Sequence, residues 1–243
     1  MSSVTIIIPV LNEETTIKSC LLSVYSLRPL PNEVIVVDGG SNDETLSIAR
    51  AFNCKILNSP EKGRACQQDY AALKSKSELI IFLHADTIPH RHMVALVQKT
   101  LAKDEVVLGG FKSIMRGEKT RKVISFHNYI KTYYAPFLYN PYRTLFKGLK
   151  LLFGDQVIFC RKADYVKAGG FDLNQYVMEE AAFCLRMNKL GRITQLNDKV
   201  YSSDRRVVKW GVLKAHMLYI LICTAWGFGF SSKNLAKLYP DIR

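Results

Sequence analysis

Two aspartates stand at the ends of apolar runs, where a carboxylate can reach a ligand. Asp38 follows a run of valine and isoleucine and precedes Gly39 and Gly40, whose lack of side chains lets a ligand approach the backbone. A carboxylate there could accept hydrogen bonds from a base or ribose, or it could cap the turn that follows. Asp86 closes a second apolar run. Its hard carboxylate oxygens are the kind of ligand that Mg²⁺ or Mn²⁺ prefers, with phosphates and water filling the other positions.

A pair of adjacent glutamates, Glu179 and Glu180, offers a general base. They begin a segment of helical character that ends near Gly191, so their position could also reflect the preference of acidic residues for a helix N-terminus. Neighbouring helical residues point about 100 degrees apart, so only one of the two should face an acceptor. Lys62 and Arg64 flank a glycine. They could contact phosphate or uracil, or form an ordinary basic loop.

Five short apolar runs without polar alternation predict strands that are buried on both faces. Stretches of helical character separate them, and this alternation indicates a doubly wound, parallel sheet. Such sheets bind ligands beyond the carboxyl ends of their strands, where polar residues follow the first four runs. The expected strands are 4–10, 33–38, 54–58, 78–83 and 106–111.

The bulk composition limits the partners and the compartment. The chain has 243 residues, enough for one large α/β domain, and its 34 basic and 21 acidic residues give a net charge of +13. This charge favours an anionic partner such as a nucleotide, a nucleic acid or an acidic lipid. The six cysteines include no CxxC pair, and no secretory signal precedes the first strand. We therefore expect free thiols and a cytoplasmic protein.

The stretch 116–150, called the basic aromatic segment below, combines eight Lys or Arg with one acidic residue and many aromatics. Such a segment suits an anionic membrane surface or an acceptor. Aromatics could also stack on bases, but no RNA-binding signature accompanies them, so no nucleic acid is expected. The alternative is a solvated helix pair packed on the core. A second run, 217–230, is uncharged and mostly apolar but has only 14 residues, whereas a membrane-spanning helix needs about 20. This run is expected to pack or to lie in a membrane interface.

The order of these motifs resembles that of the family 2 glycosyltransferases, which have the GT-A fold. The matching pieces are IIIPVLNEE, VIVVDGGSNDET, FLHAD, and AGGF followed by MEEAAFCLRMNKLG, and they extend from Val4 to about Arg192. A bacterial subgroup with GRA, LHAD, GDQ and MED-like motifs is the most similar. Those pieces are here 63–65, 83–86, 154–156 and 178–180.

The resemblance implies an inverting transfer of a sugar from a nucleotide diphosphate, with UDP as the expected nucleotide, to an unknown acceptor that could be lipid-linked. Asp86 would bind Mn²⁺ or Mg²⁺, and Glu180 would be the catalytic base, with Glu179 as the other candidate. The remaining expected contacts to the nucleotide sugar are Pro9, Asn12, Glu13, Asp38, Lys62 and Arg64, and those on the acceptor side are Asp155 and Gln156.

Three features depart from the family pattern. Glu180 stands where the family usually has Asp, which lengthens the base by one methylene group. The usual DXD is reduced to His84-Ala85-Asp86, which leaves Asp86 as the only protein carboxylate for the metal. The later QXXRW-like element is weak, and its nearest counterpart is Asp204-Arg205-Arg206 with Trp210.

The expected architecture is an α/β GT-A domain with a Rossmann-like, mostly parallel sheet flanked by helices and a C-terminal helical appendage. The GT-A domain would cover 1–205, with a nucleotide-binding half, 1–111, and an acceptor half, 112–205. The appendage, 206–243, could associate with the inner face of the cell membrane. Two other classes stay open. A nucleotidyltransferase usually has a glycine-rich phosphate loop after its first strand, unlike the sequence from Pro9 to Glu13. A catalytically silent membrane-associated binding protein would use only the basic aromatic segment.

Overall fold

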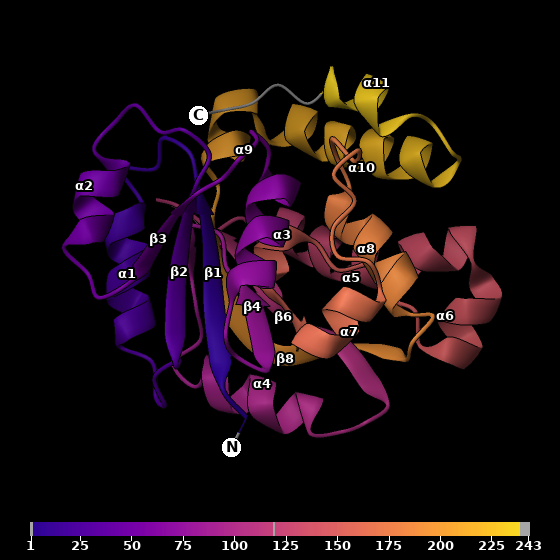
Figure 1. The fold of residues 1–243 in the computed structure, drawn as a ribbon. Helices are drawn as coiled ribbons and strands as arrows, with labels where there is room; N and C mark the ends of the chain where they lie inside the picture. The colour runs from indigo at the N-terminus through magenta and orange to yellow at the C-terminus, as the bar shows by residue number, and fades with distance from the viewer. Residues whose placement is uncertain (1, 119, 239–243) are drawn as a thin grey trace.

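The computed structural model describes residues 2–118 and 120–238 and shows one twisted sheet flanked by helices (Figure 1). Lys119 of the basic aromatic segment and residues 239–243 of the expected appendage lie outside the described residues. The sheet has eight strands in the order β3-β2-β1-β4-β7-β6-β8-β5. This α/β arrangement confirms the predicted fold class.

The first half of the sheet is entirely parallel. Its strands are β1 (Val4–Val10), β2 (Glu33–Asp38), β3 (Lys55–Asn58) and β4 (Leu79–Phe82), each within one residue of the predicted bounds. Val10 pairs with Asp38, and Asp38 pairs with Asn58, so these strands end at the same level. The loops that follow them therefore meet along one edge.

The second half of the sheet mixes directions. It contains β5 (Thr87–Ile88), β6 (Val106–Arg116), β7 (Ile158–Arg161) and β8 (Arg192–Ser203). β7 runs antiparallel to both β4 and β6, whereas β6 and β8 are parallel and β5 and β8 are antiparallel. β6 continues five residues beyond its predicted end at Phe111, because the far end of β8 supplies backbone partners as far as Arg116. Four of the seven pairings are parallel, as expected for a mostly parallel sheet.

Helices cover both faces of the sheet because alternate side chains of its strands point to opposite sides. In β1, Ile6 and Ile8 join one core cluster and Ile7 joins the other. The first cluster packs beneath α1 (Ile17–Tyr25), α2 (Thr45–Arg50) and α4 (Met93–Leu101). The second packs beneath α3 (Arg64–Lys74), α5 (Lys122–Tyr139), α7 (Lys162–Lys167) and α8 (Glu179–Met187).

The basic aromatic segment folds into two helices, α5 and α6 (Pro141–Lys147). The last part of the description consists of α9 (Arg205–Trp210), α10 (Val212–Gly227) and α11 (Ser232–Ala236). These three helices lie at the opposite end of the molecule from the N-terminus (Figure 1). The hydroxyl of Tyr139 on α5 donates a hydrogen bond of 2.7 Å to the carbonyl of Cys223 on α10. The division of the chain at residue 205 stays a prediction.

All six cysteines are free thiols, as expected, and four of them are buried. None of the helices within the described ranges has both the length and the apolar character needed to cross a bilayer.

Candidate active site

A cavity of about 230 Å³ lies beyond the carboxyl ends of β1 and β4. Residues that follow β1, those that follow β4, and the first turns of α3 and α8 form its walls. Seven of the predicted site residues line it, namely Pro9, Glu13, Arg64, Asp86, Asp155, Glu179 and Glu180. The structure thus brings together side chains that lie up to 171 positions apart in the sequence, from 9 to 180.

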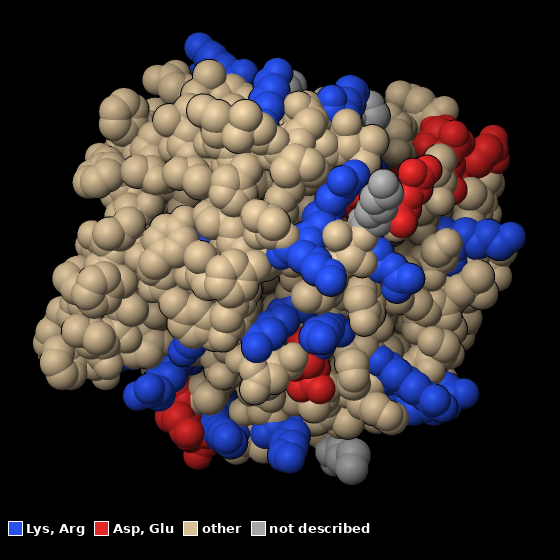
Figure 2. All heavy atoms as spheres, turned by 180° about the vertical axis from the view of Figure 1, so that it is seen from behind, with Lys and Arg blue, Asp and Glu red and all other residues tan. Residues whose placement is uncertain are grey.

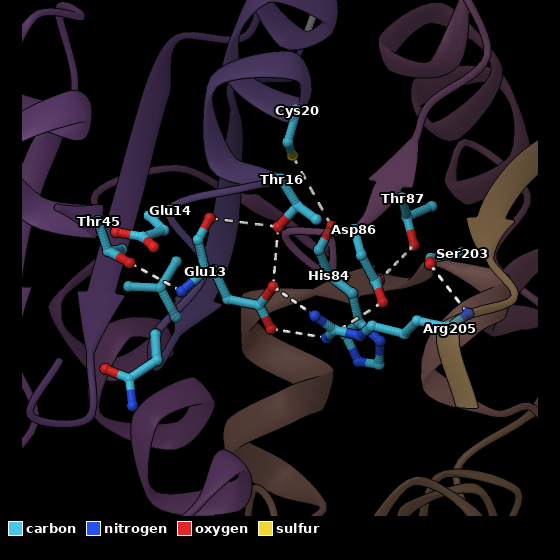
Figure 3. A network of polar contacts seen from close by, with 12 residues as sticks. Glu13, Glu14, Thr16, Cys20, Thr45, His84, Asp86, Thr87, Ser203 and Arg205 are labelled. Atoms are coloured by element: carbon cyan, nitrogen blue, oxygen red, sulfur yellow. Dashed lines mark hydrogen bonds and ion pairs between the residues drawn. The ribbon is translucent and has the colours of Figure 1, made fainter. Parts of the chain in front are cut away.

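Arg205 joins the loop after β1 to the loop after β4. Its Nη1 and Nη2 donate hydrogen bonds of 2.8 and 2.7 Å to the two carboxylate oxygens of Glu13. Nη2 also lies 3.2 Å from Oδ2 of Asp86. Figure 3 shows the guanidinium reaching between the two carboxylates, with Thr16 donating a further hydrogen bond to Glu13. Arg205 begins α9, and the sequence indicated it only through the weak QXXRW-like element.

Asp86 is the candidate metal ligand. Its carboxylate borders the cavity and is 17% exposed. Burial raises the pKa of Asp86, and the positive charge of Arg205 opposes this shift. Within 2–118 and 120–238, no three His, Cys, Asp or Glu side chains cluster so that they could hold a metal ion. A single carboxylate fits Mg²⁺ or Mn²⁺ when substrate phosphates and water supply the other ligands. Asp86 therefore suits a cation that arrives with a diphosphate.

Glu179 and Glu180 start α8 and are both buried. The Nε atom of Arg64 lies 3.6 Å from Glu179, and its Nη1 lies 3.6 Å from Glu180. Both carboxylates line the cavity, although we expected only one of the pair to face the acceptor; the shared Arg64 lies within reach of both. Burial, together with the charge of Glu179, raises the pKa of Glu180 to about 7, while Arg64 opposes the shift. A carboxylate with such a pKa can take up a proton near neutral pH.

Gly154 lets Glu180 and His84 approach the backbone. A Cβ atom at this position would collide with the ring of His84 and with Oε1 of Glu180. Nε2 of His84 lies 4.0 Å from that same oxygen, which is buried and accepts no hydrogen bond from the described part of the chain. The glycine of the GDQ motif thus leaves room for the candidate base and its imidazole neighbour.

The other predicted nucleotide contacts do not line the cavity. The buried carboxylate of Asp38 accepts hydrogen bonds from the backbone N–H groups of Gly40 and Ser41 and from the Ser41 hydroxyl. The side-chain oxygen of Asn12 accepts a 2.9 Å hydrogen bond from the backbone of Asn42, which fastens the loop after β1 to the loop after β2. Lys62 is exposed. The ligand roles of these three residues stay predictions.

α3 is fixed at the same edge by Gln67, which the sequence analysis did not single out. Its buried Nε2 donates hydrogen bonds to the carbonyls of Val10 and Val37, at the ends of β1 and β2. These bonds fix the first turn of α3, from which Arg64 extends to the two glutamates. Gly39 makes this possible because an added Cβ would lie only 3.0 Å from the Gln67 amide.

The expected acceptor side is bordered by α5. Asp155 accepts a hydrogen bond from Asn128, and Gln156 donates a 2.9 Å hydrogen bond to the hydroxyl of Thr132, so Gln156 is buried behind the cavity wall. Four residues of α5 line the cavity at helical spacing, namely Ile124, His127, Asn128 and Lys131. This spacing is visible in the sequence, but the stronger basic and aromatic pattern of the segment obscured it.

Solved structures with the GT-A fold are similar to this chain. A mannosyltransferase from Pyrobaculum calidifontis in complex with GDP-Man and Mn²⁺ is 20% identical, with a TM-score of 0.70 over 100% of this chain and 65% of that one. Glucosyl-3-phosphoglycerate synthase from Mycobacterium tuberculosis, in complex with Mn²⁺, UDP and phosphoglyceric acid, is 20% identical, with a TM-score of 0.64 over 94% of this chain and 79% of that one. These similarities establish the GT-A fold.

Sequence comparison adds the family. The family described as Glycosyl transferase family 2 matches residues 5–167, and the chain belongs to it. Glycosyltransferase AglE from Haloferax volcanii is 35% identical over 116 residues, which cover 44% of this chain and 38% of AglE. The chain aligns with less than half the length of such curated relatives.

We predict that Glu180→Gln stabilises the protein at alkaline pH. The raised pKa means that folded wild-type protein retains a proton that the unfolded chain releases near pH 4.5, so its stability falls as the pH rises from about 4.5 to about 7. Glutamine does not titrate, so the variant does not lose stability as the pH rises through this range. The free energy of unfolding at pH 8 should exceed that of the wild type by about 1 to 3 kcal/mol, because one pKa unit corresponds to about 1.4 kcal/mol. Urea unfolding at pH 4 and pH 8 measures the difference. An equal effect of the substitution at both pH values would contradict the raised pKa.

Proposed function

We propose that this protein is an inverting glycosyltransferase that transfers a sugar from a nucleotide diphosphate, UDP in the first instance, to a hydroxyl acceptor. The observation that carries the proposal is the juxtaposition of a buried carboxylate of raised pKa, Glu180, and a metal-compatible carboxylate, Asp86, on one cavity. The cavity lies beyond the carboxyl ends of parallel strands, and such sheets bind nucleotides there. Family membership supports the same chemistry.

Each wall of the cavity has a distinct role in this proposal. Pro9, Glu13 and Arg64 border the nucleotide, and Asn12, Asp38 and Lys62 contact it from the adjoining loops. Asp86 holds Mn²⁺ or Mg²⁺, which supplies positive charge to the departing diphosphate when bound. Glu180 accepts the proton of the acceptor hydroxyl as that oxygen attacks the anomeric carbon. Asp155 and Gln156 shape the acceptor side.

One proton acceptor beside the acceptor hydroxyl is consistent with a single displacement, which inverts the anomeric centre. Arg64 lies 3.6 Å from both Glu179 and Glu180. In this proposal its guanidinium holds Glu179 in the ionised form, while the carboxylate of Glu180 accepts the proton. The raised pKa of Glu180 points to it as the base. A nucleotidyltransferase and a catalytically silent binding protein are the alternatives that the experiments below separate from a glycosyltransferase.

We further propose that the protein works at the cytoplasmic face of the membrane, where a lipid-linked acceptor would be within reach. Exposed apolar side chains gather on three neighbouring helices, namely Phe126, Phe137 and Leu138 on α5, Tyr142, Leu145 and Phe146 on α6, and Leu213, Met217 and Leu221 on α10. Half of the face in Figure 2 is almost free of charge, and Lys and Arg border it more often than Asp and Glu. No acidic residue occurs in α5, α6 or α10.

This surface has the properties of an interfacial membrane contact. Apolar residues occur on every side of α10, with Lys214 as its one charged residue, and such a helix is ordinarily covered on most of its surface. One side of α10 carries Tyr219 and Ile222 into the cavity wall, whereas Leu213 and Met217 on another side are more than 60% exposed. Apolar side chains bordered by Lys and Arg bind anionic bilayers through burial and charge together. The free thiols agree with a reducing compartment.

For the metal, Asp86→Ala should abolish the Mn²⁺-dependent part of UDP binding, because it removes the carboxylate that would anchor the cation. Isothermal titration with UDP, with and without Mn²⁺, measures this part, and GDP in place of UDP tests the nucleotide. Asp198→Ala, at an aspartate near His90 and outside the cavity, is the matched control and should bind like the wild type. Unchanged Mn²⁺-dependent affinity in Asp86→Ala would refute the assignment.

For the base, Glu180→Gln should lower the release of UDP from a UDP-sugar, with water or an acceptor as nucleophile, by roughly 10²- to 10⁴-fold. UDP affinity should change little, since the base does not hold the nucleotide. Wild-type turnover should rise with pH through about 7, because the carboxylate must first lose its proton. Glu179→Gln is the matched control and should lower UDP release less than Glu180→Gln does. Glu180→Asp tests whether turnover depends on the extra methylene group of the glutamate. If Glu179→Gln loses turnover and Glu180→Gln keeps it, Glu179 is the base.

For the membrane, the wild type should float with anionic liposomes and less well with neutral ones, and salt should weaken the binding. Leu213→Glu combined with Met217→Glu should reduce recovery several-fold because both side chains would enter the interface. Leu22→Glu combined with Leu73→Glu is the control, since these exposed leucines lie on α1 and α3. Equal recovery with neutral and anionic vesicles would argue against the proposal.

A further inference from the structure

Lys131 is a buried cation that the roles above do not use. It lies on α5, its residue is only 8% exposed, and it lines the cavity on the side of Asp155 and Phe153. The sequence analysis included it only as one of eight basic residues of a segment expected to contact a membrane surface or an acceptor. In the structure it faces the cavity rather than the exposed surface of α5.

The ammonium group of Lys131 lies over aromatic rings rather than in an ion pair with a carboxylate. Nζ lies 3.6 Å from the centre of the Phe153 ring and 5.9 Å from that of Tyr219. Across the described part of the chain, it makes no hydrogen bond and has no acidic oxygen within 4.0 Å. The acidic residues nearby have other partners, since Asp155 accepts from Asn128 and Glu180 lies beside Arg64.

A buried charge without a directly bound partner is unfavourable. Burial accordingly lowers the pKa of Lys131, and the nearby Cys223, Asp155 and Glu180 oppose only part of this shift. Aromatic faces compensate for only part of the lost hydration. An anionic oxygen brought by a ligand would supply the missing partner through charge-assisted hydrogen bonds. The site is therefore complementary to a ligand that carries a negative charge of its own.

Apart from Asp155 and Glu180, the side chains near Lys131 are neutral or apolar. Burial, with contributions from His216 and Lys131, lowers the pKa of His127 to about 4, so its imidazole is neutral at pH 7 and shares a 2.8 Å hydrogen bond with the hydroxyl of Tyr134. Met115, Ile124 and Ile222 line the same region. A ligand here would have an apolar body and one anionic group.

We propose that Lys131 binds an oxyanion, either phosphate or carboxylate, that belongs to the acceptor and is distinct from the diphosphate of the donor. The identification of this ligand as the acceptor rests on the proposed glycosyltransferase function, whereas the oxyanion site itself rests on the cavity and on Lys131 alone. The oxyanion can come from a soluble acceptor or from the headgroup of an amphiphile. In both cases Lys131 selects against neutral acceptors and helps to bring the attacking hydroxyl to Glu180.

The test is isothermal titration of three probes in the absence of nucleotide: inorganic phosphate, octyl phosphate below its critical micelle concentration, and the neutral octyl glucoside. Lys131→Met replaces the ammonium with an unbranched apolar side chain one atom shorter, so it removes the charge and the contact of Nζ with Phe153 but still fills most of the space. It should weaken octyl phosphate binding by about tenfold or more, as expected for the loss of a buried charge-assisted hydrogen bond. Binding of octyl glucoside should change less than twofold. Lys131→Arg should retain most of the preference for the anion.

Lys112→Met is the matched control, because Nζ of Lys112 also lies over an aromatic ring, 4.4 Å from the centre of Tyr129, but outside the cavity wall. Tighter binding of octyl phosphate than of inorganic phosphate supports an amphiphilic acceptor, and equal binding supports a soluble one. Thermal unfolding checks each variant, and Lys131→Gln replaces Lys131→Met if the latter does not fold.

Two outcomes would overturn the proposal. The first is wild-type affinity of Lys131→Met for octyl phosphate. The second is an equal loss of UDP affinity in the same variant, which would assign the ammonium to the donor. The proposed function fails separately: if wild-type protein neither binds UDP with Mn²⁺ nor releases it from a UDP-sugar, while octyl phosphate still depends on Lys131, the oxyanion site stands without the transferase.

Discussion

The bidentate pair between Arg205 and Glu13 connects parts of the chain that are 192 residues apart and fixes the geometry of the cavity. The loop after β1, the end of the β4 loop at Asp86 and the start of α9 all meet at this guanidinium. Guanidinium and carboxylate match in shape, so the pair fixes orientation as well as distance. Because α10 follows α9 directly, the same contact also ties the last wall of the cavity to the sheet.

The acidic side chains of the cavity are partly balanced by two arginines that lie between them. The cavity contains five acidic side chains, Glu13, Asp86, Asp155, Glu179 and Glu180, and the structure gives two cations shared roles among them. Arg205 serves Glu13 and Asp86, and Arg64 serves Glu179 and Glu180. In the proposed function, a divalent cation that arrives with a diphosphate would take the place of Arg205 beside Asp86, while the two hydrogen bonds to Glu13 would keep the guanidinium near the phosphates.

The sequence predicted the part of this site that depends on local pattern. Buried parallel strands have a strong apolar signature, so β1, β2 and β4 and the acidic residues at their ends could be located without a structure. β8 could not be located in this way, because Gln195, Asn197 and Asp198 interrupt its apolar pattern and its stability comes from pairing with β6. The end of β6 was missed for the same reason. The sequence pattern did not reveal the importance of Arg205, because its partners Glu13 and Asp86 are distant in sequence. It did not reveal that of Lys131 either, because its burial in the cavity depends on residues that are distant in sequence.

The two sides of α10 connect the membrane proposal with the acceptor proposal. α10 lies between the site and the outside, because Ile222 and Tyr219 are in the cavity wall and Leu213 and Met217 are on the surface. If the outer side lies in a bilayer, an amphiphile whose headgroup reaches Lys131 need move only across the width of one helix, about 10 Å, to leave the membrane and meet Glu180. Its apolar body would stay beside Met115, Ile124 and Ile222 during the transfer. Under these two proposals, the exposed aromatic residues of α5 would hold the protein at the membrane surface, and the polar residues on its inner side would recognise the acceptor. Both patterns in this one segment of sequence would then have a function.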